Sequence, residues 1–179
     1  MKRQINQQIT LKPQDLLVLL KFTTPRTNLL GYAELGVQLA ISASEIHASV
    51  KRARLARLIV SEPNEAVRLD KGSLKEFILY GAKYVFPAIL GTETRGVLTS
   101  YAAPPLNNLI IQPNTLPPVW PNPHGGTRGV AYYPLYPTVP FAAERDNLLY
   151  EALALFDAIR GGAAREREIA ANLLSERLS

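Results

Sequence analysis

Proline is distributed unevenly along this chain, and its distribution limits the fold more than any other feature. Eleven of the 14 prolines lie within residues 84–140, which also hold most of the tyrosines. Proline has no backbone N–H and clashes with the preceding helical turn, so this stretch cannot form long helices. Residues 1–83 and 141–179 consist mainly of helix-forming residues. We therefore expect helices at both ends of the chain and short strands and turns between them.

Composition narrows the class of protein. The chain has 179 residues, of which 47% are hydrophobic, enough for the core of one domain or of two small ones. The absence of cysteine excludes disulfides, thiolate metal ligands and cysteine nucleophiles. A formal net charge of +5 suits a partner that carries phosphates. The longest apolar run near the N-terminus, residues 16–20, is too short for a signal peptide or a membrane span, so we expect a cytoplasmic protein without membrane contact.

Residues 12–40 have the pattern of two helices. The first is predicted over residues 12–22, where an apolar run follows Pro13, a residue that a helix tolerates in its first turn. Pro25 then prevents this helix from continuing. A short second helix is predicted over residues 31–40, GYAELGVQLA.

A third helix is predicted to start at Ala43. Ser42 is followed three positions later by Glu45, which is the spacing of a capping box. Apolar side chains spaced by four and three positions mark the buried face of this helix: Ile46, Val50 and Ala53. The opposite face carries mainly polar and basic residues: Ser44, His47, Ala48, Lys51 and Arg52.

The segment after the third helix has the pattern of a β-hairpin. Two short apolar stretches, residues 58–60 and 66–69, flank the turn-forming residues Glu62, Pro63 and Asn64. Three helices followed by a hairpin is the order of elements in a winged helix-turn-helix domain.

Residues 32–60, YAELGVQLAISASEIHASVKRARLARLIV, resemble the winged helix-turn-helix regulators of bacteria, most closely the MarR-like group. In this resemblance residues 32–40 correspond to the positioning helix, Ile41 and Ser42 to the start of the recognition helix, and residues 58–60 to the strand before the wing. The chain departs from the family at Arg57, where the family usually has a glycine that ends the recognition helix. The resemblance implies a transcriptional regulator that binds double-stranded DNA.

The C-terminal part resembles bacterial helix-turn-helix proteins with a YVFPA segment, a proline-rich region and a tail of the pattern RxGxARERE. Here the two motifs are residues 84–88 and 160–168. Some relatives of this kind lie beside toxin-like genes, so the resemblance also implies an antitoxin whose C-terminal lobe binds a toxin. The expected fold is α+β, with a winged helix-turn-helix domain over residues 1–83 and a lobe of short β-hairpin segments and two helices over residues 84–179.

The third helix is expected to read DNA, because the major groove admits one helix whose N-terminal side chains meet the base edges. Lys51 and Arg52 suit guanine edges or phosphates, and Ala48 suits a thymine methyl group. The first amides of a helix capped by Ser42 suit a phosphate. Residues of the wing are placed for the minor groove or the backbone. The full set of expected DNA contacts is Ser42, Ser44, Glu45, His47, Ala48, Lys51, Arg52, Asn64 and Arg68.

Each of these residues also has a purely structural interpretation. Ser42 and Glu45 cap a helix whether or not DNA is present, and the charge of Glu45 repels phosphate. The basic side chains of the third helix form a solvated face in most proteins, and Arg68 equally fits an ordinary surface. His47 has no second ligand at a useful spacing, so no metal site is expected.

The middle of the chain offers no legible catalytic or cofactor site. After a helix capped by Gly72 or Ser73, the segment GTETRG, residues 91–96, has the composition of a loop. The turn at residues 122–126 separates two apolar stretches and predicts a second β-hairpin. The GGTRG run beside His124 lacks the Gly-Lys-Ser/Thr ending and the following helix of a phosphate loop. We therefore expect neither an enzyme nor a cofactor.

Two helices are predicted at the C-terminal end, over residues 147–160 and 164–178. The apolar stripe of the first is so broad that it needs burial on two sides, by its own core or by another subunit. Helices outside a winged motif often dimerise such proteins and match their symmetry to palindromic operators. We therefore expect a homodimer.

The residues favour a sequence-specific DNA-binding regulator, most simply a repressor. An antitoxin that represses its own operon and binds a toxin is the first alternative. The second is a protein-interaction module whose winged fold contacts protein instead of DNA. An enzyme working near residues 120–124 ranks last, because no acid–base constellation is legible there.

Overall fold

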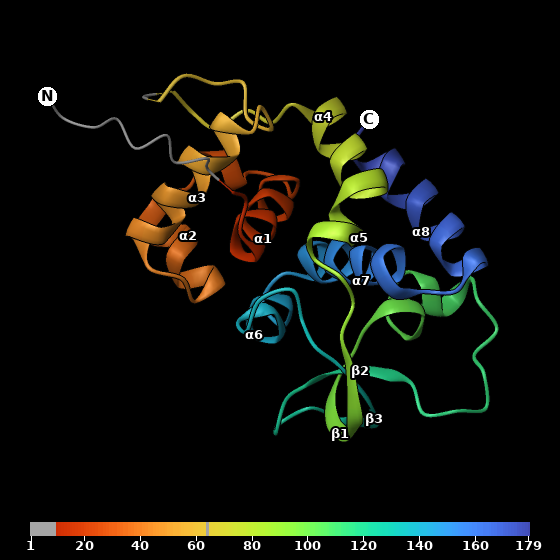
Figure 1. Ribbon diagram of the computed structural model, residues 1–179. Coiled ribbons are helices and arrows are strands. Elements are labelled where there is room, and N and C mark those ends of the chain that lie inside the picture. Colours follow the sequence, from red (N-terminus) through yellow and green to blue (C-terminus); the bar gives the residue numbers. More distant parts are fainter. Residues whose placement is uncertain (1–9, 64) are drawn as a thin grey trace, which may run out of the picture.

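The structure is a computed structural model that describes residues 10–63 and 65–179 (Figure 1). Its fold mixes helices with a small sheet, and helices occupy both ends of the chain, as the proline distribution predicts. The helices are α1 (Pro13–Phe22), α2 (Tyr32–Leu39), α3 (Ala43–Leu55), α4 (Lys71–Glu76), α5 (Ala82–Val85), α6 (Val139–Ala143), α7 (Asn147–Gly161) and α8 (Ala164–Arg177). The strands are β1 (Leu90–Leu98), β2 (Pro118–Pro121) and β3 (Thr127–Tyr132).

The helices α1 and α2 both pack against α3, and all three helices begin within one residue of the predicted positions. α1 is apolar on several sides because it packs on α3 and also on α7. α3 begins where the Ser42 hydroxyl accepts a hydrogen bond from the amide of Glu45, at 3.2 Å. The other half of the predicted capping box does not form, because the Glu45 carboxylate bonds to Gln14 and Arg52 instead.

A three-residue turn, Ala40 to Ser42, joins α2 to α3. Ala40 ends α2 in the left-handed conformation, with φ of 52°. Gly36 of α2 lies so close to the turn that a Cβ atom there would stand 2.5 Å from the carbonyl oxygen of Ile41. Glycine is therefore required at this position, and the close approach fixes the direction in which α3 leaves α2.

The chain after α3 folds back on itself, as the hairpin pattern predicts. Ile59 and Leu69 form an isolated antiparallel bridge, and the amide of Val60 donates to the carbonyl oxygen of Arg68 at 2.9 Å. Residues 61–63 and 65–67, drawn in yellow in Figure 1, lie at one edge of the three-helix unit formed by α1–α3.

α4 begins earlier than predicted. Its cap is Asp70, whose carboxylate accepts a hydrogen bond from the amide of Ser73 at 2.9 Å, so the prediction that Gly72 or Ser73 caps this helix is wrong. Aspartate is preferred at this position because its side chain satisfies an amide that has no partner within the helix. A π-helical turn, Phe77–Gly81, connects α4 to α5.

The three strands pair with one another, and the predicted second hairpin is wrong. β1 pairs antiparallel with both β2 and β3, so β2 and β3 run parallel to each other. The segment 91–96, predicted as a loop, is part of β1. Prolines at both ends of β2 cannot donate a ladder hydrogen bond, and β1 supplies the pairing that a hairpin partner would have supplied.

Glycines allow the strands to cross closely. Gly96 of β1 is the partner of both Pro121 and Thr127. A Cβ atom on Gly125 would lie 2.2 Å from the carbonyl carbon of Gly96, so the β2–β3 connection passes directly over β1.

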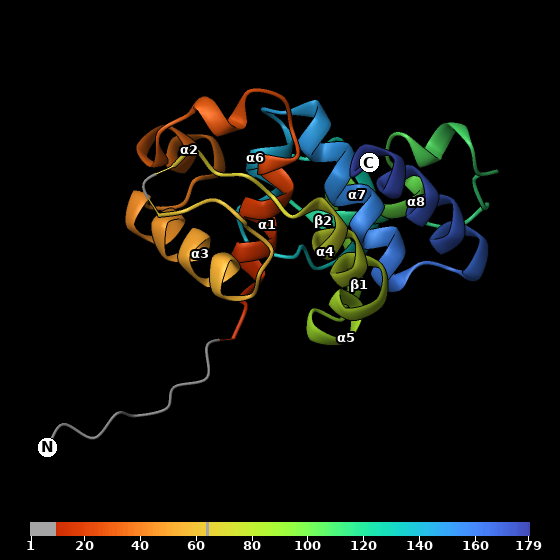
Figure 2. The same cartoon turned by 90° about the horizontal axis from the view of Figure 1, so that it is seen from above.

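α7 is the central helix of the C-terminal half. It packs against α1, α5, α6 and α8, which are visible on its different sides in Figures 1 and 2. Its residues 152–159 are all buried within one chain. The breadth of its apolar stripe therefore requires no second subunit. The hydrophobic core is continuous from α1 to α8. The Lys21 ammonium of α1 also pairs, at 2.6 Å, with Asp146, the residue that caps α7.

A buried carboxylate ties the sheet to α7. Asp157 accepts hydrogen bonds from the Thr99 hydroxyl at 2.7 Å, the Trp120 indole at 2.6 Å and Arg160 at 2.8 Å. Burial raises the pKa of Asp157, while these three donors act in the opposite direction. Arg160 also donates to the carbonyl oxygen of Tyr133 at 2.9 Å. The bonds from Thr99 and Trp120 to Asp157 are buried.

Every helix in residues 10–63 and 65–179 is too short or too polar to cross a bilayer.

Candidate nucleic-acid interface

α3 turns one face to solvent. Four residues spaced by three and four positions are exposed on it: Ser44, His47, Lys51 and Leu55. Ala48 lies among them and is half-buried. The opposite face is buried against α1 and α2 through Ile46, Ser49, Val50 and Ala53. A helix of 13 residues is about 20 Å long, so the exposed face is a straight ridge of that length.

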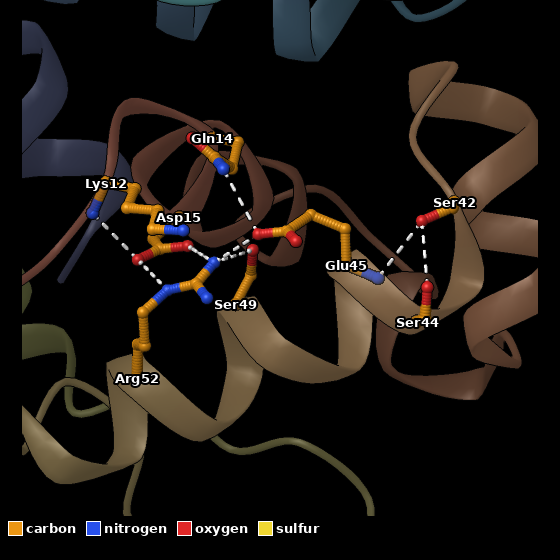
Figure 3. Close-up of polar contacts among 8 residues, drawn as sticks. All are labelled: Lys12, Gln14, Asp15, Ser42, Ser44, Glu45, Ser49 and Arg52. Atoms are coloured by element: carbon orange, nitrogen blue, oxygen red, sulfur yellow. Dashed lines mark hydrogen bonds and ion pairs between the residues drawn. The ribbon is translucent and has the colours of Figure 1, made fainter. Parts of the chain in front are cut away.

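The N-terminal end of this ridge is held by short polar contacts. The hydroxyl oxygens of Ser42 and Ser44 lie 3.0 Å apart. A dashed line joins them in Figure 3. The imidazole of His47 packs edge-on against the ring of Tyr32 in α2, with ring centroids 5.8 Å apart. α2 therefore sets the orientation of the His47 ring while the side chain stays exposed.

Arg52 points away from this ridge. Its guanidinium donates to both carboxylate oxygens of Asp15 in α1, at 2.8 and 2.7 Å (Figure 3). It also bonds to Glu45 at 2.5 Å and to Ser49 at 3.2 Å. Only 14% of the Arg52 side chain is exposed, and that of Asp15 is fully buried. The structure therefore places Arg52 in a contact between α1 and α3, where sequence reasoning expected a side chain directed at DNA.

The reason for this orientation is the charge of Asp15. A buried carboxylate is costly unless it is paired and hydrogen-bonded, and a bidentate arginine satisfies both of its oxygens. Position 52 lies at the border of the buried face of α3, next to Ala53, so its side chain reaches α1. Two carboxylates beside it raise the pKa of Arg52 further.

Glu45 belongs to the same cluster. Its carboxylate accepts from Arg52 and from the Gln14 amide, at 2.5 and 3.1 Å. The hydrogen bond from Arg52 lowers the pKa of Glu45, and burial opposes this effect. Because its charge is offset within the cluster, Glu45 repels an approaching phosphate less than an isolated carboxylate would.

The loop after α3 carries charges of both signs. Arg68 is exposed, and so are Glu62 and Glu65. Arg54 donates to the carbonyl oxygens of Ser61 and Glu62, at 2.7 and 3.3 Å, and so fastens the loop to the end of α3. The expected contact Asn64 lies outside the described residues.

Sequence reasoning missed two features of this surface. Asp15 was not recognised as the partner of Arg52, although a lone acid before a run of apolar residues in the first helix is a usable signal of a paired buried charge. Leu55, with 57% of its surface exposed, adds an apolar residue to the C-terminal end of the ridge.

Outside α1–α3, the described residues offer weaker candidates for a functional site. His124 is exposed on the β2–β3 connection. Within the part of the chain that the structure describes, no three histidine or acidic side chains gather as metal ligands would. Comparison with protein-family models, curated proteins and solved structures finds no match to this chain.

Proposed function

We propose that this chain is a DNA-binding transcriptional regulator that uses α1–α3 and the Ile59–Leu69 hairpin as a winged helix-turn-helix, with α3 in the major groove. The observation that carries the proposal is the α2–turn–α3 arrangement. Its turn has three residues and is tightened at Gly36, and α3 presents a ridge that is exposed to solvent within the described residues.

The dimensions of α3 support this use. An α-helix with its side chains is about 10–12 Å across, and the major groove is about 12 Å wide. Ser44 and His47 lie near the N-terminus of α3, where a recognition helix meets the bases. Lys51 lies one turn further along and is placed for a guanine edge or a phosphate. Ala48 between them lets the helix approach closely.

Arg52 has a different role in this proposal. It holds α3 on α1 through Asp15 and so positions the ridge, while Lys51 contacts DNA. A single substitution that tests DNA contact must therefore change Lys51, because replacing Arg52 alone leaves the buried Asp15 carboxylate without its partner.

In this proposal the wing contacts the phosphate backbone of DNA through one basic residue. Arg68 is exposed, but Glu62 and Glu65 in the same loop repel phosphates. Specificity is therefore assigned to α3, and Arg68 provides a sequence-independent contact. Without an effector, a protein that occupies DNA in this way acts most simply as a repressor.

The test is fluorescence anisotropy with the DNA upstream of the chain's own gene, against a scrambled duplex, over a salt series. Lys51→Glu is expected to weaken binding to the upstream DNA by about 1–3 kcal/mol, roughly tenfold to a hundredfold in Kd, and to lower the salt slope by about one contact. Arg165→Glu, on the exposed surface of α8, is the matched control because it changes the net charge equally.

The control separates a specific interface from general basic character. Arg165→Glu is expected to bind as the unmodified chain does. Equal losses in the two variants, or equal affinity for upstream and scrambled DNA, would contradict the proposal.

A protein-interaction module is the second candidate. Val37 on α2 and Leu55 on α3 have 75% and 57% of their surface exposed, which suits a protein surface better than a polyanion. Under this alternative, Leu55→Asp abolishes capture of a protein partner and Lys51→Glu leaves it unchanged.

A further inference from the structure

A small hollow lies where the three strands meet the connection between α7 and α8. Its volume is about 210 Å³. The strands and the segment before β2 supply a mainly apolar wall, which consists of Leu90, Leu116, Pro118, Val130 and Tyr132. A dry apolar cavity of about 150 Å³ holds a benzene molecule, so this hollow has room for a body of that size with a short arm.

Two glycines form the wall on the side of α7 and α8. A Cβ atom on Gly161 would lie 2.5 Å from the hydroxyl oxygen of Tyr132. A Cβ atom on Gly162 would lie 2.8 Å from the carboxylate oxygen Oε2 of Glu166. Glycine at these two positions therefore allows Tyr132 and Glu166 to line the same hollow.

The carboxylate in this hollow is that of Glu166, which is half-buried. Its Oε2 accepts a hydrogen bond from the amide of Ala163 at 2.9 Å. A carboxylate offers about four acceptor positions, so this bond leaves room for a further donor. Burial raises the pKa of Tyr101, which also lines the hollow, and the negative charge of Glu166 acts in the same direction.

The arginines near this carboxylate are bound to other groups. Arg160 pairs with Asp157 at 2.8 Å, and Arg167 donates to the carbonyl oxygen of Gly162 at 2.8 Å. Glu166 belongs to none of the ion pairs formed within residues 10–63 and 65–179. The apolar hollow is therefore bordered by a half-buried negative charge that has no counter-charge in an ion pair.

The backbone is strained at the same place. Ser100 lines the hollow, is almost completely buried and has φ of 53°, a left-handed conformation that is unfavourable for a residue with a side chain. This conformation turns the chain from β1 into a short 3-10 helix, Ser100–Ala102. Strained residues persist where the surrounding structure holds them, and they cluster at sites that bind ligands.

We propose that this hollow binds a small organic ammonium ion, that is, a protonated amine with an aromatic or branched apolar body. The ammonium donates to the Glu166 carboxylate, and the body packs on the apolar wall. A positive charge is required because a neutral ligand leaves the carboxylate unpaired and an anion is repelled by it. The chain as a whole has a net charge of +5, so its overall field does not attract cations and the selectivity must be local.

This site goes beyond DNA binding and does not depend on it. Figures 1 and 2 place α3 and the α7–α8 connection on opposite sides of the molecule. The amine is therefore expected to bind without DNA, and a failure of this test leaves the test of DNA binding unaffected.

The first experiment titrates the full chain with phenethylamine, which is protonated at neutral pH, and follows the methyl groups of Leu90, Leu116 and Val130 by NMR. These signals are expected to shift and to saturate. Phenethyl alcohol, a neutral molecule of nearly the same shape, is expected to bind roughly tenfold more weakly, because it cannot form a charge-assisted hydrogen bond with the carboxylate. Phenylacetate, an anion, is expected to cause no shift.

The second experiment removes the charge from the hollow. Glu166→Gln keeps an oxygen that accepts from the Ala163 amide, since glutamine also serves in a capping box. This variant is expected to bind phenethylammonium roughly tenfold more weakly and phenethyl alcohol as before. Glu168→Gln is the matched control, because it removes the same charge from an exposed position of α8 outside the hollow, and it is expected to bind as the unmodified chain does.

Three results would overturn the proposal. The first is methyl signals that do not shift at any concentration of phenethylamine. The second is equal affinity of the unmodified chain for phenethylammonium and phenethyl alcohol, a comparison that holds even where Glu166→Gln proves unstable. The third is an equal loss in Glu166→Gln and Glu168→Gln, which would indicate general attraction between charges.

Discussion

The guanidinium of Arg52 in α3 binds both carboxylate oxygens of Asp15, which is completely buried in the first turn of α1. The two residues are 37 positions apart in the sequence, and their contact joins α1 to the helix that we propose enters DNA. Basic residues on α3 are therefore of two kinds. Lys51 is exposed to solvent, whereas Arg52 is mostly buried and joins α3 to α1.

Removal of the Arg52 side chain is expected to destabilise the protein strongly. Arg52→Ala leaves the Asp15 carboxylate buried without a counter-charge, a defect worth about 3–5 kcal/mol of unfolding free energy. Urea denaturation measures this loss. Lys51→Ala, at an exposed position, is the matched control and is expected to change stability by less than about 0.5 kcal/mol. A loss for Arg52→Ala as small as that of the control would show that the buried pair does not form.

Replacement of both partners is expected to restore most of this stability. Arg52→Met combined with Asp15→Leu removes the buried charge together with its partner and fills similar volumes. The double variant is therefore predicted to be more stable than Arg52→Ala alone. Thermal unfolding followed by circular dichroism measures the difference, and a double variant less stable than the single one would contradict this explanation.

Acid is expected to weaken the contact at Glu45. The hydrogen bond from Arg52 lowers the pKa of Glu45 in the folded chain, so this residue adds stability above its unfolded pKa of about 4.3. That stability is lost as the pH falls through the lower, folded pKa. The difference in urea midpoint between the unmodified chain and Glu45→Gln should therefore shrink from neutral pH toward pH values below about 4. A difference independent of pH would contradict the assignment.

The turn between α2 and α3 is expected to gain stability from glycine at position 40. Ala40 has φ of 52°, and a left-handed conformation costs a residue with a side chain about 1 kcal/mol. Ala40→Gly is predicted to raise the melting temperature by about 2 °C. Ala33→Gly, inside α2, should lower it, because glycine in a helix is unfavourable. A decrease for both variants would contradict the strain at Ala40.

Gly36→Ala is expected to act in the opposite direction. Its methyl group would meet the backbone oxygen of Ile41 at 2.5 Å, so α2 and the turn must separate, at about 1–3 kcal/mol. Because this displaces α3, affinity for DNA should fall together with stability. A fully stable Gly36→Ala variant would show that the close approach is not needed.

The parts of the fold that were predictable from sequence are those with local signals. The periodicity and the Ser42 cap locate α3 correctly, and the turn residues between two apolar stretches locate the Ile59–Leu69 bridge. β1 was missed because residues 92–95 are all polar and carry no apolar alternation. The parallel relation of β2 and β3 depends on the crossing of Gly125 over Gly96, which no local pattern reveals.

The candidate site divides in the same way. The exposure of Ser44, His47 and Lys51 follows from helical spacing and agrees with the predicted face. The orientation of Arg52 depends on a partner in another helix, so spacing within α3 could not supply it. The broad apolar stripe of α7 likewise did not indicate whether the same chain or a second subunit buries it. The structure shows that helices of the same chain pack against it.

The most direct test of the account compares DNA binding of the double variant Arg52→Met/Asp15→Leu with that of Lys51→Glu, using the DNA upstream of the chain's own gene and fluorescence anisotropy. The apolar replacements in the double variant keep α3 packed on α1 and so keep the ridge in position. We predict that this variant, once shown to be folded, binds with the affinity of the unmodified chain, while Lys51→Glu binds roughly tenfold to a hundredfold more weakly. A folded double variant that loses affinity while Lys51→Glu retains it would show that Arg52 contacts DNA and would contradict the account.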